Sequence, residues 1–192
     1  ILCTWQCGQE AGNSIADVLS GKSYPSGKLP MTFPLDYRDQ ASDRNFPHDA
    51  DTGIIFGANK KPLTRLNPNI DHTVYEEDIY VGYRYFDSFD KNVSYPFGYG
   101  LSYTEFKYSK PRITFDGNRY KVDVTVTNTG RANGKEAVQV YVSKPAEIEV
   151  PVKELVGFAK TRELKPGESQ RLSIDIDPED LAVFDESLSA WV

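Results

Sequence analysis

The sequence predicts a short α/β segment followed by an antiparallel β-sandwich. Near the start of the chain, an extended run, a run of helical period, a turn and a second extended run follow one another, which is the order of an α/β unit. Beyond residue 106, apolar residues recur with a period of two in short runs separated by turn residues, as in half-buried antiparallel strands. Within residues 95–106 the sequence changes from an irregular, loop-rich pattern to apolar runs of period two.

Composition restricts the class of protein. With 39% hydrophobic and 26% charged residues in a chain of 192, the balance is that of a globular protein of one or two domains. The net charge of -6 disfavours nucleic acid as a partner, because an acidic surface repels phosphate. The sequence has no apolar run of about 18 residues, the length that a membrane-spanning helix needs.

The α/β segment is expected to begin in the middle of a domain. Residues 1–7 have the character of the end of a buried strand and lack the charged start and cleavage site of a signal peptide. Apolar residues at helical spacing predict a helix over 9–19, and Gly21 suits its C-terminal stop. A turn at 23–27 and a short extended run at 28–33 follow.

Residues 35–74 show no clear period and are rich in Pro, Asn and Asp. A loop of this length is uncommon in a compact domain and is usually functional or mobile. Two interpretations stay open: the stretch 42–72 reaches toward a neighbouring active site, or it is a linker on the surface.

Three consecutive carboxylates, Glu76, Glu77 and Asp78, raise the question of acid–base catalysis. Glycosidases hold two carboxyl groups at a set separation, each in its own environment. Neighbouring side chains on an extended chain point to opposite sides, so these three residues are poor candidates. We expect a solvated turn in which one carboxylate pairs with Arg84 or with a backbone group.

No metal site and no cofactor are expected. Cys3 and Cys7 are the only cysteines, and His48 and His72 lie far from them in loops, whereas a structural zinc site needs about four ligands. Two cysteines do not make a disulfide scaffold, so two ordinary thiols are expected.

The aromatic stretch 95–106 has two possible roles. Gly98 and Gly100 allow backbone conformations closed to other residues, and the aromatic residues around them offer a rigid surface. That surface would serve either as a packed junction between domains or as a carbohydrate site. For the junction we expect five aromatic side chains to be mostly buried: Tyr83, Tyr85, Phe97, Tyr99 and Tyr103.

Four runs predict the strands of the sandwich: 120–128, 136–143, 153–160 and 169–176. A sandwich of seven strands would need about two more, and Trp191-Val192 resembles the opening of one of them. We therefore expect the sandwich to be incomplete at its C-terminus and both ends of the chain to be cut from a longer protein.

Five blocks, in order, resemble the C-terminal portion of glycoside hydrolase family 3, the β-glucosidase and β-xylosidase group. Residues 5–19 (WQCGQEAGNSIADVL) match a family segment in which Ala is commoner than Ser at position 14, and 25–34 (PSGKLPMTFP) match its turn. Residues 75–86 (YEEDIYVGYRYF) and 96–104 (PFGYGLSYT) resemble the next two blocks. Parts of 126–158 are similar to the family's fibronectin-III-like domain.

The resemblance implies three regions. Residues 1–40 would end the family's α/β-sandwich domain, 41–105 would form a long loop and an aromatic junction, and 106–192 would form a truncated fibronectin-III-like sandwich. Partners would be the remainder of the same glycosidase, with its TIM-like barrel, and the carbohydrate substrate of the whole enzyme. A secreted or periplasmic location is the family's expectation.

The resemblance also implies a retaining, exo-acting β-glycosidase, most often a β-glucosidase. In the family the aspartate nucleophile and the glutamate acid/base lie upstream of the WQCGQE block, so no catalytic residue is expected here and the sugar-binding residues are unknown. Glu10, Glu76, Glu77 and Glu136 match structural motif positions. The alternative function is a non-catalytic module that binds carbohydrate or scaffolds other domains; a self-contained enzyme using Glu76 or Glu77 with Asp78 is disfavoured.

Overall fold

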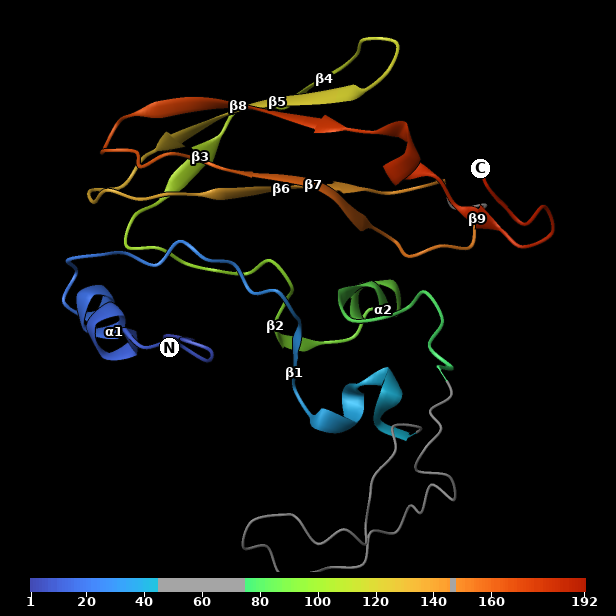
Figure 1. The fold of residues 1–192 in the computed structure, drawn as a ribbon, viewed down its shortest axis with the longest axis horizontal. Coiled ribbons are helices and arrows are strands. Elements are labelled where there is room, and N and C mark those ends of the chain that lie inside the picture. The colour runs from blue at the N-terminus through green and yellow to red at the C-terminus, as the bar shows by residue number, and fades with distance from the viewer. Residues whose placement is uncertain (45–74, 146–147) are drawn as a thin grey trace, which may run out of the picture. The chain divides into compact units, whose positions relative to one another are not determined.

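The computed structural model describes residues 1–44, 75–145 and 148–192. The chain divides into two compact units (Figure 1). The first unit comprises Ile1–Pro30, Gly98–Ser143 and Glu154–Val192. The second comprises Met31–Phe97 and Lys144–Lys153.

The first unit contains the predicted β-sandwich. One sheet consists of β3 (Phe106–Tyr108), β4 (Arg112–Phe115), β5 (Tyr120–Asn128) and β8 (Ser169–Ile176). The other consists of β6 (Ala137–Val142) and β7 (Glu154–Lys160). β5 is central to its sheet, because β8 pairs with it along one edge while β3 and β4 share the other, all antiparallel (Figure 1). All four predicted strands are confirmed.

Period-two alternation places the core between the sheets. Val122, Val124 and Val126 on β5 are buried, while the residues between them are half-exposed. Their cross-strand neighbours on β8 point to the same face, as pairing on a pleated sheet requires. The buried core cluster consists of Val122, Val124, Val126, Val138, Leu164, Leu172, Ile174 and Ile176.

The N-terminal part of this unit contains one helix, α1 (Ala11–Leu19). The predicted helix is confirmed, and Gly21 follows it at φ 77°, the left-handed conformation that commonly ends helices. No residue of α1 is buried. The predicted strand at 1–7 is wrong: these residues form no strand and are largely exposed, because the described part of the chain offers them no pairing edge.

Short elements complete the first unit. The 3-10 helix η3 (Pro178–Leu181) leads to β9 (Phe184–Asp185), which pairs with β10 (Ala190–Trp191). The ring of Phe184 meets the ring of Trp191 edge-on, with centroids 5.5 Å apart. The run at Trp191 is a strand, but it belongs to a separate two-stranded sheet with β9, so its membership of the sandwich stays a prediction.

The second unit is held together by short pairings. β1 (Phe33–Pro34) pairs with β2 (Val93–Tyr95), and the 3-10 helices η1 (Tyr37–Asp39) and η2 (Ala41–Arg44) follow β1. The helix α2 (Tyr83–Ser88) contacts the 144–153 segment, where Lys153 pairs with Asp87 at 3.1 Å. Among the helices that the structure describes, none combines the length and apolar character needed to cross a membrane.

Candidate functional site

A network of polar contacts in the first unit lies where residues 24–30 meet the sandwich. The backbone of Leu29 pairs with the aromatic stretch 95–106, which contains Gly98 and Gly100 and is called the glycine-rich stretch below. The Leu29 N–H donates to the Tyr99 carbonyl, and the Leu29 carbonyl accepts from the Gly98 N–H, each at 2.8 Å. Two residues of that stretch thus oppose one residue, Leu29, and the first of them is a glycine at positive φ, which is the pattern of a G1 β-bulge. It fixes the register of the two segments.

Both glycines of the PFGYG sequence are required by this geometry. Gly98 has φ 78°, and a Cβ there would meet the Gln139 side chain. A Cβ on Gly100 would meet the carbonyl of Gly27. The prediction that these glycines serve backbone conformation is therefore confirmed for Gly98, while Gly100 serves close approach.

A buried ion pair joins the 24–30 segment to the sandwich. The Lys28 Nζ lies 2.8 Å from Glu136 Oε1, and the two side chains are only 17% and 11% exposed. Lys28 also donates to the Gly100 carbonyl at 2.9 Å, and the Tyr108 hydroxyl donates to Glu136 Oε1 at 2.7 Å. We call Lys28, Glu136 and Tyr108 the Lys28 cluster.

The backbone around Glu136 is also fixed. Its N–H donates to Thr161 Oγ1 and its carbonyl accepts from the Thr161 N–H, each at 2.9 Å. Burial, and next the hydrogen bond to Glu136, raise the pKa of Tyr108 well above its usual value. Tyr108, like any tyrosine at physiological pH, is a neutral donor, and Lys28 supplies the charge that balances Glu136.

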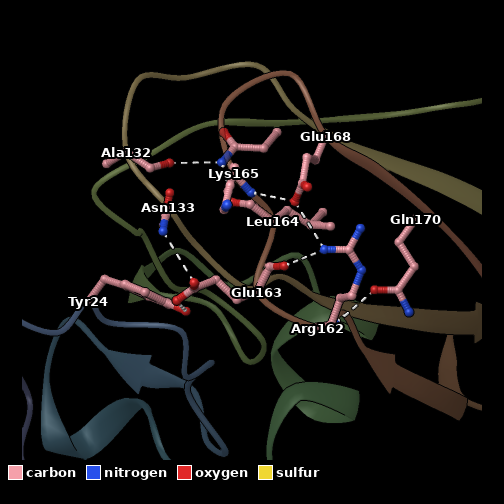
Figure 2. A network of polar contacts seen from close by, with 10 residues as sticks. Tyr24, Ala132, Asn133, Arg162, Glu163, Leu164, Lys165, Glu168 and Gln170 are labelled. Atoms are coloured by element: carbon pink, nitrogen blue, oxygen red, sulfur yellow. Dashed lines mark hydrogen bonds and ion pairs between the residues drawn. The ribbon is translucent and has the colours of Figure 1, made fainter.

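A second contact lies four residues earlier in the segment. The Tyr24 hydroxyl donates to Glu163 Oε2 at 2.7 Å, and the Asn133 amide donates to the other carboxylate oxygen at 3.2 Å (Figure 2). Burial, and next the hydrogen bond to Glu163, raise the pKa of Tyr24 to about 12. Both Glu163 oxygens thus accept hydrogen bonds from neutral donors.

The loop that carries Glu163 is braced by its own polar contacts (Figure 2). The Arg162 guanidinium donates to the Glu163 carbonyl at 2.7 Å and to Glu168 Oε2 at 3.0 Å, while the Lys165 N–H donates to Glu168 at 2.9 Å. The Arg162 N–H donates to Gln170 on β8 at 2.8 Å. The Lys165 N–H, and next Arg162, hold the pKa of Glu168 below its usual value.

Asn128, at the end of β5, is fully buried, and its side chain takes part in four hydrogen bonds. Its Oδ1 accepts from the Thr104 hydroxyl at 2.7 Å and from the Gly130 N–H at 3.1 Å. Its amide donates at 2.8 Å to the carbonyls of Ala132 and Leu164. This side chain ties the glycine-rich stretch to two loops of the sandwich.

The predicted acidic residues have different surroundings. Glu10 accepts from Asn13 at 2.6 Å at the start of α1, and Glu136 belongs to the Lys28 cluster. Residues 76–79 form the predicted turn, in which Glu76 and Asp78 are exposed and Glu77 is half-buried. The predicted pairing of one carboxylate with Arg84 or a backbone group stays a prediction.

The expected burial of the aromatic junction is wrong for two side chains. Tyr99 is 38% exposed and Tyr103 is 50% exposed. Tyr103 lies at the surface of its unit, where its hydroxyl donates to the Val18 carbonyl at the end of α1, at 2.9 Å. In the second unit, the rings of Tyr83 and Phe97 stack with centroids 4.6 Å apart.

The other candidate chemistry is sparse in the described residues. Cys3 and Cys7 are free, exposed thiols, and His48 and His72 lie outside the described residues. No group of three His, Cys, Asp or Glu side chains in the described ranges could hold a metal ion. A shallow groove of about 400 Å³ between β7 and β8 has one carboxylate in its lining, Asp175.

The residues that connect the segments were not singled out in the sequence. Tyr24 lies in the predicted turn 23–27, Lys28 begins the predicted extended run 28–33, and Glu163 lies between the predicted strands 153–160 and 169–176, so no local pattern predicts their contacts. The sequence offers one signal for these contacts. Tyr24, which has an aromatic hydroxyl, and Lys28, a cation, lie four residues apart on either side of Pro25-Ser26-Gly27.

Comparison with known proteins shows which family the chain belongs to and which domains the connected segments lie in. The glycosyl hydrolase family 3 C-terminal domain matches residues 1–103, more than half of the chain. The chain belongs to glycoside hydrolase family 3. A fibronectin type III-like domain matches residues 136–192 of this family 3 chain. The Lys28 cluster therefore joins the two matched domains, since Lys28 lies in the first and Glu136 in the second.

Relatives of the family 3 chain cover its whole length. It is 42% identical to β-glucosidase B of Emericella nidulans and 38% identical to an exo-α-(1→6)-L-arabinopyranosidase of Bifidobacterium longum, in each case over 100% of the chain. It spans only 22% and 23% of those proteins. The structure of β-glucosidase 3B from Thermotoga neapolitana with α-D-glucose matches 94% of the chain with a TM-score of 0.79 and 47% identity, and 23% of that protein is covered.

Proposed function

We propose that this chain is the C-terminal part of a retaining, exo-acting β-glucosidase that hydrolyses terminal β-linked sugars. The observation that carries the proposal is the match to β-glucosidase B along the whole chain, at 42% identity. The aspartate nucleophile and the glutamate acid/base would lie in parts of the enzyme outside this chain. The chain itself would be inactive.

The surroundings of the described carboxylates support a structural role. Glu136 and Glu163, the two that hold the 24–29 segment, are occupied by Lys28, Tyr108, Tyr24 and Asn133. A retaining mechanism needs two carboxyl groups about 5 Å apart, one of them free to attack the sugar. The shallow β7–β8 groove contributes a single carboxylate.

The partners in this proposal are the remainder of the same glycosidase and its carbohydrate substrate, with no nucleic acid or membrane partner. The regions 1–40, 41–105 and 106–192 would be the end of the α/β-sandwich domain, a loop with an aromatic junction, and the fibronectin-III-like domain. The stretch 42–72, which lies almost entirely outside the described residues, would reach the substrate entrance.

A second specificity is favoured by one observation, the 38% identity to an exo-α-(1→6)-L-arabinopyranosidase. The test is to assay the full-length enzyme with aryl β-D-glucoside and aryl α-L-arabinopyranoside, and to follow the first-formed anomer by NMR. We expect faster hydrolysis of the glucoside with β-glucose released first. Release of α-glucose would contradict retention. Binding of sugar without hydrolysis of either substrate would favour the alternative of a non-catalytic module.

A further inference from the structure

We propose that Glu136 and Glu163 form a paired acidic receptor by which the fibronectin-III-like domain recognises residues 24–29 of the same chain. The inference rests on the proposed function, in which the fibronectin-III-like domain supports the glycosidase, and it names the contact that provides this support. The two carboxylates come from different loops of the sandwich and meet side chains four residues apart on one segment.

The segment is bound by backbone pairing at Leu29 and by two specific side chains. The Leu29 backbone makes two hydrogen bonds of 2.8 Å with the 98–99 stretch. Lys28 reaches Glu136 at 2.8 Å and Tyr24 reaches Glu163 at 2.7 Å. Backbone pairing supplies affinity and side-chain pockets supply specificity in this mode of peptide recognition.

The chemistry of the receptor selects one kind of occupant. The Glu136 position requires a cation on a long side chain, because the Lys28 ammonium also donates to the Gly100 carbonyl at 2.9 Å. The Glu163 position requires a hydroxyl donor of aromatic length. Gly100 leaves room for the Gly27 carbonyl, which a side chain there would meet. The segment of the same chain meets all three requirements and is held at high effective concentration by its covalent link.

Burial gives the contact a distinctive thermodynamic signature. Removing one partner of a buried ion pair leaves the other charge without compensation, whereas removing both leaves no uncompensated charge. The double variant at Lys28 and Glu136 should therefore lose less stability than the sum of the losses in the two single variants. An exposed pair should show almost no such coupling.

The experiment uses the full-length enzyme that contains this chain, with Glu136→Gln, Lys28→Met and the double variant. The matched control is the exposed pair Lys121–Asp175, separated by 3.6 Å on neighbouring strands, as Lys121→Met, Asp175→Asn and their double. Thermal unfolding gives the coupling. Trypsin reports docking directly, because the Lys28–Leu29 bond becomes cleavable only when the segment leaves the sandwich.

We expect Glu136→Gln to speed cleavage after Lys28 roughly tenfold, the factor that 1.4 kcal/mol of lost docking would give. The melting temperature of the double variant should equal or exceed that of the less stable single variant. Trypsin should cleave Asp175→Asn after Lys28 at the wild-type rate. Unchanged cleavage in Glu136→Gln, with melting shifts that add in the double variant, would overturn the proposal.

A second pair keeps the test decisive if Glu136→Gln does not fold. Glu163→Gln and Tyr24→Phe weaken only the other contact and should raise the same cleavage several-fold; wild-type cleavage in both would overturn the proposal. The hydrolysis of aryl β-D-glucoside is measured on the same samples. If the wild-type enzyme does not hydrolyse the glucoside but Lys28 and Glu136 show stability coupling, only the proposed function is contradicted. If the enzyme hydrolyses the glucoside but the two residues show no coupling, only the proposed acidic receptor is contradicted.

Discussion

Replacing Asn128 by Ala tests how the sandwich holds the glycine-rich stretch. The change removes all four hydrogen bonds of a fully buried side chain. The Thr104 hydroxyl loses its buried partner, whereas the Leu164 carbonyl keeps its hydrogen bond from the Gly134 N–H at 3.1 Å. An unsatisfied buried group costs about 1–3 kcal/mol. The Gly130 N–H and the Ala132 carbonyl are half-buried and regain water. With about 1 kcal/mol more for the lost hydrogen bond to the Leu164 carbonyl, we expect a loss of about 2–4 kcal/mol in the free energy of unfolding.

Urea unfolding followed by circular dichroism measures this loss. Asn118→Ala, in the exposed turn between β4 and β5, is the matched control and should change stability by less than about 0.5 kcal/mol. A loss below about 1 kcal/mol for Asn128→Ala would refute the assignment of Asn128 as the connecting residue, because four bonds of 2.7 to 3.1 Å would then contribute almost nothing.

The substitution Asn128→Asp adds a test with a definite pH dependence. One oxygen of the introduced carboxyl group would face two carbonyl oxygens, so burial and repulsion raise its folded pKa above the unfolded value of about 3.9. Stability is then fully present below the unfolded pKa and is lost as pH rises through the folded pKa. The variant should become more stable relative to the wild type as pH falls from 7 to 4. A difference that stays constant with pH would show that the group is hydrated.

Three further predictions concern single contacts. Gly98→Ala should destabilise more than Gly167→Ala in urea unfolding, because both residues have positive φ but only at Gly98 would the Cβ meet the Gln139 side chain; equal losses would contradict this. The wild type should lose stability relative to Tyr24→Phe between pH 10 and 12, because the folded pKa of Tyr24 is raised from 10.0 to about 12 and ionisation then favours the unfolded state; parallel pH profiles would contradict the contact. Deletion of 42–72 should raise KM for aryl-glucosides and oligosaccharides in the full-length enzyme, and an unchanged KM would leave that stretch as a surface linker.

Local patterns predicted the strands well because alternation is a local property. Val122, Val124 and Val126 alternate with polar residues, and β5 has the same bounds as the predicted run. The turn at Gly21 and the turn of the three carboxylates followed from residue type alone. Membership of the family followed from ordered blocks that span the chain.

Contacts between distant segments could not be predicted in this way. Lys28 and Glu136 are 108 positions apart, and neither residue differs locally from a solvated charge. The strand expected at 1–7 needed a pairing edge that the described residues do not provide. The hydrogen bond from Tyr103 to the Val18 carbonyl likewise joins residues 85 positions apart.

The most direct test of the central claim is an assay of aryl-β-glucoside hydrolysis on the purified 21.6 kDa chain, with its intact mass confirmed on the same sample. The proposed function predicts no hydrolysis by the chain alone and hydrolysis by the full-length enzyme. Hydrolysis by a folded 21.6 kDa species would contradict it and would place the catalytic carboxylates within this chain, with Glu76, Glu77 and Asp78 as the first residues to replace.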